Sequence, residues 1–171
     1  LDPAAPDANR YAIGDLLGTG ATSHVYAARD RTFDREVAIK FLEAGLATDG
    51  KTLWVADSET SSVRAVPLTS RGEVRTLVGQ DLFKFGDVDG VGDNARLQHA
   101  LGVAYHAGKL YVADTYNSKI KILDPVTREC KTFLGGEPGG RPTTPLFSEP
   151  AGIDYADGKL YVADTNAHRI R

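Results

Sequence analysis

GLATDGKTLWVADSETSSVRAV (residues 45–66), GVAYHAGKLYVADTYNSKIKIL (102–123) and GIDYADGKLYVADTNAHRIR (152–171) are three versions of one pattern. In each version a glycine lies twelve residues before the aspartate of a Val-Ala-Asp sequence. A β-branched residue follows six positions after that aspartate, as Val63, Ile120 and Ile170. Such a repeat indicates an architecture in which each copy is one structural unit that packs on the next.

The local composition of each copy is that of short antiparallel β-strands. Leu53–Ala56 and Leu110–Ala113 are rich in β-branched and aromatic residues and follow glycine-containing turns. Residues 63–66 and 120–122 alternate apolar with polar side chains, as half-buried strands do.

The outer strands and the loops are predicted from the stretches between the copies. Val74–Val78 and Cys130–Leu134 supply a fourth strand to the first two units, and long loops rich in Gly, Asp and Pro cover 79–100 and 135–150. The three Val-Ala-Asp aspartates are 57 and 50 residues apart, which suits a four-stranded propeller blade with an enlarged loop. We therefore predict an all-β fold, a partial (open) β-propeller of about three blades.

The copies that begin at Gly45 and Gly102 are similar to NHL repeats, above all to those of proteins that join a thioredoxin-like domain to an NHL propeller. The resemblance covers about residues 44–171 and implies a scaffold that binds a protein or a small-molecule ligand. NHL propellers usually close with about six blades. The resemblance thus implies that a homodimer could close the ring.

A second pattern lies in LLGTGATSHVYAARDRTFDREVAIK (residues 16–40). Gly18 and Gly20 form a glycine-rich turn before Val25, and a Val-Ala-Ile-Lys strand ends at Lys40, fifteen residues after Val25. Glycines at these positions let the backbone approach phosphate groups, because no side chain blocks the way.

Residues 9–42 resemble the opening strands of a eukaryotic-type serine/threonine protein kinase, so we expect an antiparallel kinase-like β-sheet in a domain of residues 9–43. The resemblance implies ATP, with Mg²⁺, as the candidate cofactor. Gly18 and Gly20 would lie near the phosphates, Val25 and Ala38 against the adenine, and Lys40 on the α- and β-phosphates.

Phosphoryl transfer needs further parts that the chain does not contain. Neither an HRD-type loop nor a DFG turn occurs in the 171 residues, and these supply the catalytic and metal-binding side chains of kinases. We therefore predict no catalytic residue. For Lys40 there are two interpretations, a nucleotide ligand and a solvated or loosely paired surface lysine. The sequence favours the surface lysine.

Composition limits the remaining classes of function. The chain has 20 basic and 23 acidic side chains and a net charge of −3, so its charge does not favour nucleic-acid binding. Cys130 is the only cysteine, which excludes an intrachain disulfide and predicts a small apolar strand residue. The sequence has no signal peptide or membrane-spanning run, which favours the cytoplasm. Residues 1–8 are predicted to be a flexible leader.

Two groups of carboxylates are candidates for chemistry. Asp57, Asp114 and Asp164 occupy one place in every copy, so we expect each to accept backbone hydrogen bonds in the turn after its strand. The sequence DVDGVGD (87–93) begins like a calcium-binding loop of the EF-hand type. Counted from Asp87, such a loop needs a side-chain oxygen ligand at position five and Glu at position twelve. Val91 and Gln98 stand there, so we predict an inter-blade loop.

Other side-chain types also receive structural interpretations. The histidines share no register, so we predict no metal site: His24, His99, His106 and His168. Three aromatic residues share the Val-Ala-Asp strand and are predicted to pack between blades: Trp54, Tyr111 and Tyr161. Five basic residues are predicted to lie on a solvated blade edge: Arg64, Lys119, Lys121, Arg169 and Arg171.

These observations leave a leading hypothesis and its alternatives. The leading one is an NHL-repeat binding scaffold, not an enzyme, that carries a truncated kinase ATP-binding hairpin. The alternative is a fragment of an ATP-binding serine/threonine kinase, inactive as given. A third hypothesis is a hydrolase or lyase with its site in the central channel. The abrupt junction at 42–45 and the form of both ends also predict a truncated or recombined gene product.

Overall fold

A computed structural model of the chain describes residues 11–20, 23–42, 45–69, 72–136 and 146–171. The predicted leader (1–8) lies outside these residues. The chain divides into two compact units after residue 44. Within the described residues, no helix has the length and apolarity needed to span a membrane.

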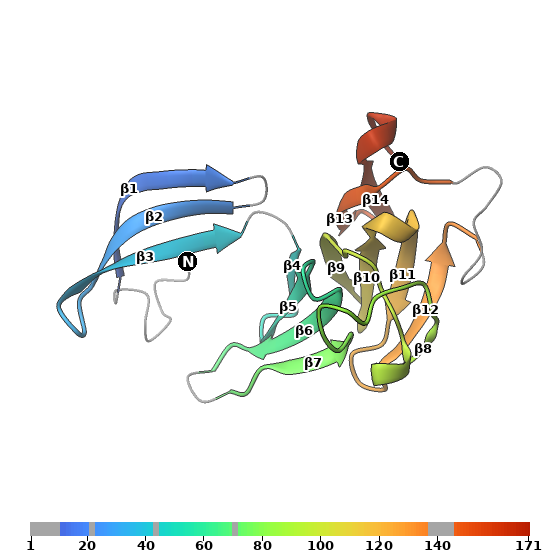
Figure 1. The fold of residues 1–171 in the computed structure, drawn as a ribbon, viewed down its shortest axis with the longest axis horizontal. Helices are drawn as coiled ribbons and strands as arrows, with labels where there is room; N and C mark the ends of the chain where they lie inside the picture. The colour runs from blue at the N-terminus through green and yellow to red at the C-terminus, as the bar shows by residue number, and fades with distance from the viewer. Residues whose placement is uncertain (1–10, 21–22, 43–44, 70–71, 137–145) are drawn as a thin grey trace. The chain divides into compact units, whose positions relative to one another are not determined.

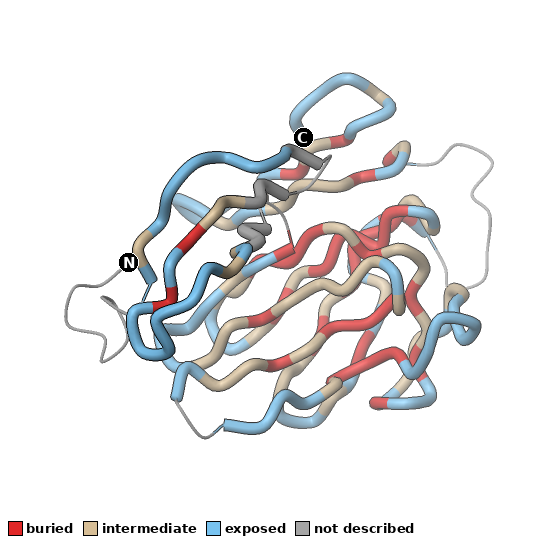
Figure 2. The backbone as a smooth tube through the Cα atoms, turned by 60° about the vertical axis from the view of Figure 1, so that its left-hand side comes forward, coloured by how far each residue is buried: buried red, intermediate tan, exposed pale blue. Residues whose placement is uncertain are grey.

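The first unit is one antiparallel sheet of three strands in the order β1-β2-β3. Its strands are β1 (Tyr11–Gly20), β2 (Ser23–Asp30) and β3 (Arg35–Leu42) (Figure 1). The tight turn between β2 and β3 is held by the Asp30 carboxylate, which accepts a hydrogen bond of 3.0 Å from the Thr32 N–H. Most of this sheet is half-buried or exposed (Figure 2).

The second unit consists of three antiparallel sheets, which we call blades 1, 2 and 3 (Figure 1). Blade 1 has the order β4-β5-β6-β7, with β4 (Leu46–Thr48), β5 (Thr52–Asp57), β6 (Ser62–Pro67) and β7 (Arg75–Val78). Blade 3 has the order β13-β14-β15, with β13 (Pro150–Ala156), β14 (Lys159–Asp164) and β15 (Arg169–Ile170).

Blade 2 has five strands in the order β8-β12-β11-β10-β9. They are β8 (Gly90–Val91), β9 (Gly102–His106), β10 (Lys109–Asp114), β11 (Lys119–Leu123) and β12 (Glu129–Leu134). The prediction of a long loop over 79–100 is wrong in part, because β8 pairs with β12 and a short 3₁₀ helix, η1 (Gly92–Asn94), follows it. The fourth strands predicted near 74–78 and 130–134 are confirmed as β7 and β12, but only β7 is the outer strand of its blade, because β8 lies beyond β12.

The hydrophobic core lies between the blades. One cluster joins blades 1 and 2 and includes Trp54, Val63, Leu110 and Val112, and a second joins blades 2 and 3 through Ile120 and Val162, among others. The buried positions of Figure 2 follow these strands. The all-β, open propeller fold predicted from the repeats is therefore confirmed.

At Gly102, the glycine that opens the second repeat, the close approach of the next blade leaves no room for a side chain. A Cβ atom there would lie 2.2 Å from the carbonyl oxygen of Ala151 on the next blade. Any side chain would therefore separate the inner strands β9 and β13.

Candidate functional site

The aromatic residues of the Val-Ala-Asp strands mark the junctions between blades. Trp54 of blade 1 stacks on Tyr105 of blade 2, with ring centroids 6.2 Å apart. Tyr111 of blade 2 stacks on Tyr155 of blade 3 at 6.3 Å. The packing prediction is thus confirmed for Trp54 and Tyr111.

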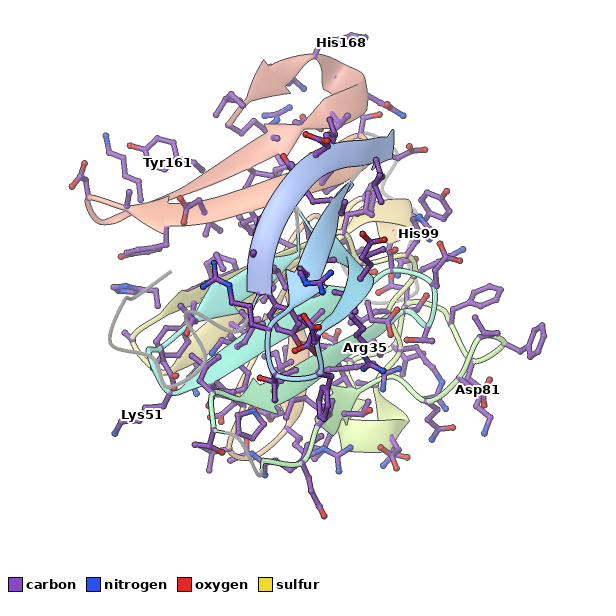
Figure 3. All side chains as sticks on the ribbon, turned by 90° about the vertical axis from the view of Figure 1, so that its left-hand side faces the viewer. Arg35, Lys51, Asp81, His99, Tyr161 and His168 are labelled. Carbon is purple, nitrogen blue, oxygen red and sulfur yellow. The ribbon has the colours of Figure 1, made fainter. Side chains whose placement is uncertain are left out.

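Tyr161 has the same place in blade 3, but its surroundings differ. It is 41% exposed, and no described residue stacks on its ring (Figure 3). The prediction that it packs between blades is therefore wrong within the part of the chain that the structure describes. Thr48 of blade 1 stands where blades 2 and 3 have Tyr105 and Tyr155, so blade 1 offers no aromatic partner of that kind.

The repeated aspartates hold the chain as it enters each blade. Asp114 accepts a hydrogen bond of 2.7 Å from the Gln98 N–H, and Asp164 accepts one of 2.6 Å from the Ser148 N–H. Both donors lie sixteen residues before their aspartate. Among the described contacts, only Asp57 accepts a backbone hydrogen bond from the turn that follows its strand, at 3.4 Å from the Thr60 N–H, whereas Asp114 accepts there from the side-chain amide of Asn117. The expected structural role is therefore supported, but the expected donor is wrong for two of three copies.

The two fully buried aspartates differ in charge environment. Burial raises the pKa of Asp114 to about 7, although the Asn117 amide and the Gln98 N–H oppose this shift by donating to the carboxylate. Burial also raises the pKa of Asp164, but hydrogen bonds from the Ser148 N–H and the guanidinium of Arg171 outweigh it and hold this pKa below its ordinary value. Equivalent positions in the repeat therefore have different titration behaviour, as expected for structural groups with different neighbours.

Serine side chains make further contacts from one blade to the next. The Ser61 hydroxyl of blade 1 accepts a hydrogen bond of 3.0 Å from the His99 N–H, on the segment that enters blade 2. The Ser118 hydroxyl does the same for the Glu149 N–H, at 3.5 Å. His168 occupies this position in blade 3 and has the same left-handed backbone, with φ of 53° against 49° and 55° for the two serines.

A buried ionic cluster corrects the prediction of a solvated blade edge. The side chains of Lys119 and Lys121 are 1% and 0% exposed. Asp87 pairs with both, at 2.5 Å from Lys119 Nζ and 2.6 Å from Lys121 Nζ. Asp89 pairs with Lys121 at 2.7 Å and also accepts from the Thr132 N–H at 2.8 Å.

The cluster also explains the acidic loop that is similar to a calcium site. Its first two aspartates bind lysine ammonium groups, so their oxygen atoms already have cationic partners. Burial raises the pKa of Asp89, but donation from Lys121 and the Thr132 N–H outweighs it and lowers the pKa below its usual value. We therefore interpret the loop as a structural segment whose aspartates neutralise the buried lysines of blade 2.

The other basic residues predicted for that edge form ion pairs within their own blades. Arg64 Nε lies 2.9 Å from Asp57 Oδ2. Arg169 and Arg171 both pair with Asp164, at 3.2 and 2.7 Å. Each of these guanidinium groups therefore has a carboxylate partner in its own blade.

Cys130 and the histidines have packing roles where the structure describes their side chains. Cys130 is fully buried in the core between blades 1 and 2, and burial raises the pKa of its thiol to about 12. His106 stacks on Tyr155 with ring centroids 3.6 Å apart, and His99 stacks on Tyr116 with ring centroids 4.4 Å apart. Among the described residues, no group of three or more His, Cys, Asp or Glu could hold a metal ion.

The inner strands of the three blades surround an open hollow of about 340 Å³. β4, β9 and β13 each end their sheet, so one edge of each strand has no neighbour among the described strands. Asp154 is the one ionisable carboxylate in the lining, and it is exposed. The other lining residues are Leu46, Ala47, Thr48, Val103, Ala104, Tyr105 and Ile153.

The predicted nucleotide residues lie on all three strands of the first unit. Backbone pairing places Val25 of β2 between Gly18 of β1 and Lys40 of β3, and Gly20 at the end of β1 opposite Ser23. Ala38 lies two residues before Lys40, opposite Ala27, and is exposed. The pairing thus brings Gly18, Val25 and Lys40 into one row across the sheet.

A shallow hollow of about 530 Å³ lies on this sheet. Ala38 is in its lining, and no other predicted nucleotide residue whose side chain the structure describes lies there. Sequence reasoning did not find its other walls, because small residues such as Ala12, Gly14 and Ala27 carry no recognisable signal.

Comparison with known sequences bears on the repeats first. The profile of the NHL repeat matches residues 147–171, which include all of blade 3. This segment matches the NHL repeat. NHL repeat-containing protein 2 of Bos taurus is 54% identical over 99 residues, which are 53% of this chain and 14% of that protein. The blades are therefore similar to those of an NHL-repeat protein, of which the chain spans about one seventh.

The other comparisons concern the fold and the first unit. An auxiliary nutrient binding protein from Bacteroides thetaiotaomicron superposes with a TM-score of 0.64 at 19% identity, over 85% of this chain and 42% of that one. This likeness shows a shared fold. Serine/threonine-protein kinase PknB of Mycobacterium leprae is 51% identical over 41 residues, which are 24% of this chain and 7% of the kinase.

Proposed function

We propose that the NHL-like blades form a binding scaffold whose ligand meets the hollow between β4, β9 and β13. The observation that carries this proposal is the hollow itself, which three repeats of one unit surround with their inner strands. Propellers with a packed body commonly bind through such exposed ends and loops. The NHL-repeat relative supports a scaffold and not a catalyst.

The lining indicates the chemistry of the ligand. The open edges of β4, β9 and β13 present backbone N–H and C=O groups, and Asp154 adds one negative charge. Backbone edges favour an extended polypeptide, which can complete their hydrogen bonds. The ligand that fits is a protein segment with a Lys or Arg side chain directed at Asp154, and a small cation is the alternative.

Asp154→Asn tests this proposal. We expect the dissociation constant of lysine-containing peptides to rise by a factor of about 1.4 to 5, because an exposed ion pair contributes about 0.2–1 kcal/mol. The measurement is fluorescence anisotropy with labelled peptide pools of positive, neutral and negative charge.

Asp157→Asn is the matched control, because Asp157 lies in the adjacent turn and outside the lining. It has a left-handed backbone, with φ of 50°, which Asn tolerates well. Equal losses in both variants would place the ligand elsewhere. Binding of free lysine as tight as that of the peptides would favour a small-molecule ligand.

A second candidate function is nucleotide binding by the first unit, with ATP and Mg²⁺ as ligand. Two observations favour it: the row of Gly18, Val25 and Lys40 across the sheet, and the identity with a kinase over 41 residues. Without HRD and DFG sequences, this unit would bind a nucleotide and not transfer its phosphate.

Lys40→Ala tests that candidate. We expect Mg-ATP binding at millimolar concentration to be lost in the variant, because Lys40 would supply the cation for the α- and β-phosphates. Isothermal titration calorimetry of the full chain measures this loss. Lys51→Ala, which removes an exposed lysine of blade 1, should leave binding unchanged. A wild-type chain that binds no ATP at millimolar concentration would end the candidate.

A further inference from the structure

One buried carboxylate holds both ends of the loop that leads into blade 2. This loop covers residues 86–98, and we call it the entry loop. Asp114, which is 0% exposed, accepts a hydrogen bond of 2.7 Å from the N–H of Gln98 at the end of the loop. Its other oxygen accepts one of 2.8 Å from the amide of Asn117, and the same amide donates to the carbonyl oxygen of Gly86 at 2.8 Å. Asp114 and Asn117 therefore fasten the neck of the entry loop to blade 2.

The entry loop is a compact cover over the interior of blade 2. The Gly86 N–H donates to the Leu97 carbonyl oxygen at 2.9 Å, so the two ends of the loop lie side by side. Between these ends, β8 pairs with β12, where Gly90 lies opposite Cys130. Leu97 and Cys130 belong to the same buried cluster. Opening of the entry loop would therefore bring water both to Cys130 and to Asp114.

The described residues of the entry loop and blade 2 bring three carboxylates and two ammonium groups together. They are the side chains of Asp87, Asp89, Asp114, Lys119 and Lys121. Asp87 and Asp89 both lie at ion-pair distance from Lys121. The two oxygens of Asp114 instead bind neutral N–H groups, and it forms no ion pair with any described residue. A buried carboxylate without a cationic partner is the one that gains a proton most readily.

Protonation of Asp114 falls in the neutral pH range. Burial raises its pKa to about 7, and the negative charge of Asp87 adds to the rise, while the two neutral donors and the charge of Lys121 oppose it. In an open loop, water would reach this carboxylate and its pKa would return toward the ordinary value of 3.8. The closed loop therefore binds the proton more tightly than the open loop does. The stability that this proton gives to the closed loop is complete below the ordinary pKa and is lost as the pH rises through about 7.

Other titratable groups around the neck keep one charge in this range. Burial raises the pKa of Asp89, but hydrogen bonds from its partners outweigh burial and lower it, so Asp89 stays ionised. Burial lowers the pKa of Lys121, but its carboxylate partners outweigh this and raise it, so Lys121 stays charged. The thiol of Cys130, with a pKa of about 12, stays neutral. His99 follows the neck in the chain, but its ring stacks on Tyr116.

We propose that Asp114 is a proton-binding site that fastens the entry loop in a pH-dependent way, so that the loop is closed on blade 2 when the carboxyl group is protonated and opens more often when it is ionised. The basis is that the one carboxyl group of the cluster without an ammonium partner among the described residues lies at the neck and holds both ends of the loop. Opening withdraws Asp87 and Asp89 from the lysines of blade 2 and loosens the junction with blade 1. Blades 1 and 2 are therefore held together more firmly in acidic than in alkaline surroundings.

Cys130 provides a probe of this opening, because it is the only cysteine of the chain and is buried in the cluster that the entry loop helps to form. Its alkylation by iodoacetamide is measured on the full chain, and each rate is divided by that of the urea-unfolded chain at the same pH. This quotient gives the fraction of open molecules and removes the pH dependence of the thiol itself. From about pH 6 to about pH 8 we expect the open fraction to rise about tenfold, because Asp114 loses its proton in this range.

Two variants at equivalent repeat positions make the test specific. Asp114→Asn removes the titrating group and keeps its shape, so the open fraction should agree at the two pH values within about twofold. Asp164→Asn is the matched control in blade 3, where the carboxylate pairs with Arg169 and Arg171, and this variant should keep the tenfold rise. A rise in Asp114→Asn as large as that in wild type would assign the effect to another group, such as His99, and overturn the proposal.

Carbon-13 NMR of the wild-type carboxyl groups tests the proposal without any variant. We expect one aspartate resonance to titrate with a midpoint near pH 7. If every carboxyl resonance titrates below about pH 5, the closed loop holds no such proton and the proposal is wrong. An open fraction of wild type that stays level or falls between the two pH values would overturn it as well.

Discussion

Asp87→Ala should lower the free energy of unfolding of the propeller unit by about 3–5 kcal/mol. Asp87 is the carboxylate shared by Lys119 and Lys121, whose side chains are 1% and 0% exposed. Its removal withdraws negative charge from two buried ammonium groups, while the pair between Asp89 and Lys121 is retained. An uncompensated buried charge costs far more than the loss of a surface ion pair.

Urea unfolding followed by circular dichroism measures this change. Asp81→Ala is the control, because Asp81 lies in the same segment (79–100) as Asp87, but its side chain is 51% exposed and forms a long ion pair of 3.8 Å with Lys84. It should change stability by no more than about 0.5 kcal/mol.

A quadruple variant separates charge from packing. Asp87→Leu/Asp89→Asn/Lys119→Met/Lys121→Met removes the four charges together, and we expect it to be more stable than Asp87→Ala, since apolar replacement of a whole buried ion cluster is often neutral. An Asp87→Ala chain as stable as wild type would show that the lysines do not depend on this carboxylate.

Trp54→Ala should destabilise the propeller unit by about 3–5 kcal/mol, the usual cost of truncating a buried Trp. Trp54 is 5% exposed and stacks on Tyr105 across the junction of blades 1 and 2. Its indole Nε1 is buried without a hydrogen-bond partner in the described structure. Trp54→Phe loses no hydrogen bond at this atom and should therefore cost much less than Trp54→Ala.

Tyr161→Ala provides the matched control, because it truncates the same repeat position where no described blade follows. With 41% of Tyr161 exposed, we expect a change within about 1 kcal/mol. Thermal and urea unfolding of the variants give the comparison. If Trp54→Ala and Tyr161→Ala lowered the free energy of unfolding by similar amounts, the aromatic ring would stabilise the strand itself and not the junction between blades.

The repeats allow the blades to be predicted because their information is local. In each blade, three consecutive strands (β4–β6, β9–β11 and β13–β15), their turns and the Val-Ala-Asp aspartate lie within about twenty residues of one another, and period-two alternation marks the strands. The buried state of Lys119 and Lys121 could not be predicted in this way. Alternation in Lys119-Ile120-Lys121-Ile122 gave them a polar face, while the loop that covers it with Asp87 lies 32 and 34 residues away.

The donors to Asp114 and Asp164 were missed for a related reason. An aspartate after a strand normally accepts from its own turn, as Asp57 does. Gln98 and Ser148 lie in segments with no repeated sequence, and only the folded path of the chain brings their N–H groups to the carboxylates. Ionic and polar contacts between distant segments depend on tertiary structure, which local periodicity does not report.

The junctions also set an order in which parts of the propeller unit can open. Blade 2 packs on blade 1 through one buried cluster and on blade 3 through another, whereas the described residues give blade 3 a single such neighbour. Transient separation of β13–β15 breaks one cluster, but release of β9–β12 breaks both. Blade 1 also has one such neighbour, but its cluster holds thirteen buried residues against four in the cluster of blade 3. Among the described blades, local unfolding is therefore expected first at blade 3, and amide hydrogens in the middle of β10 and β11 are expected to exchange with solvent last.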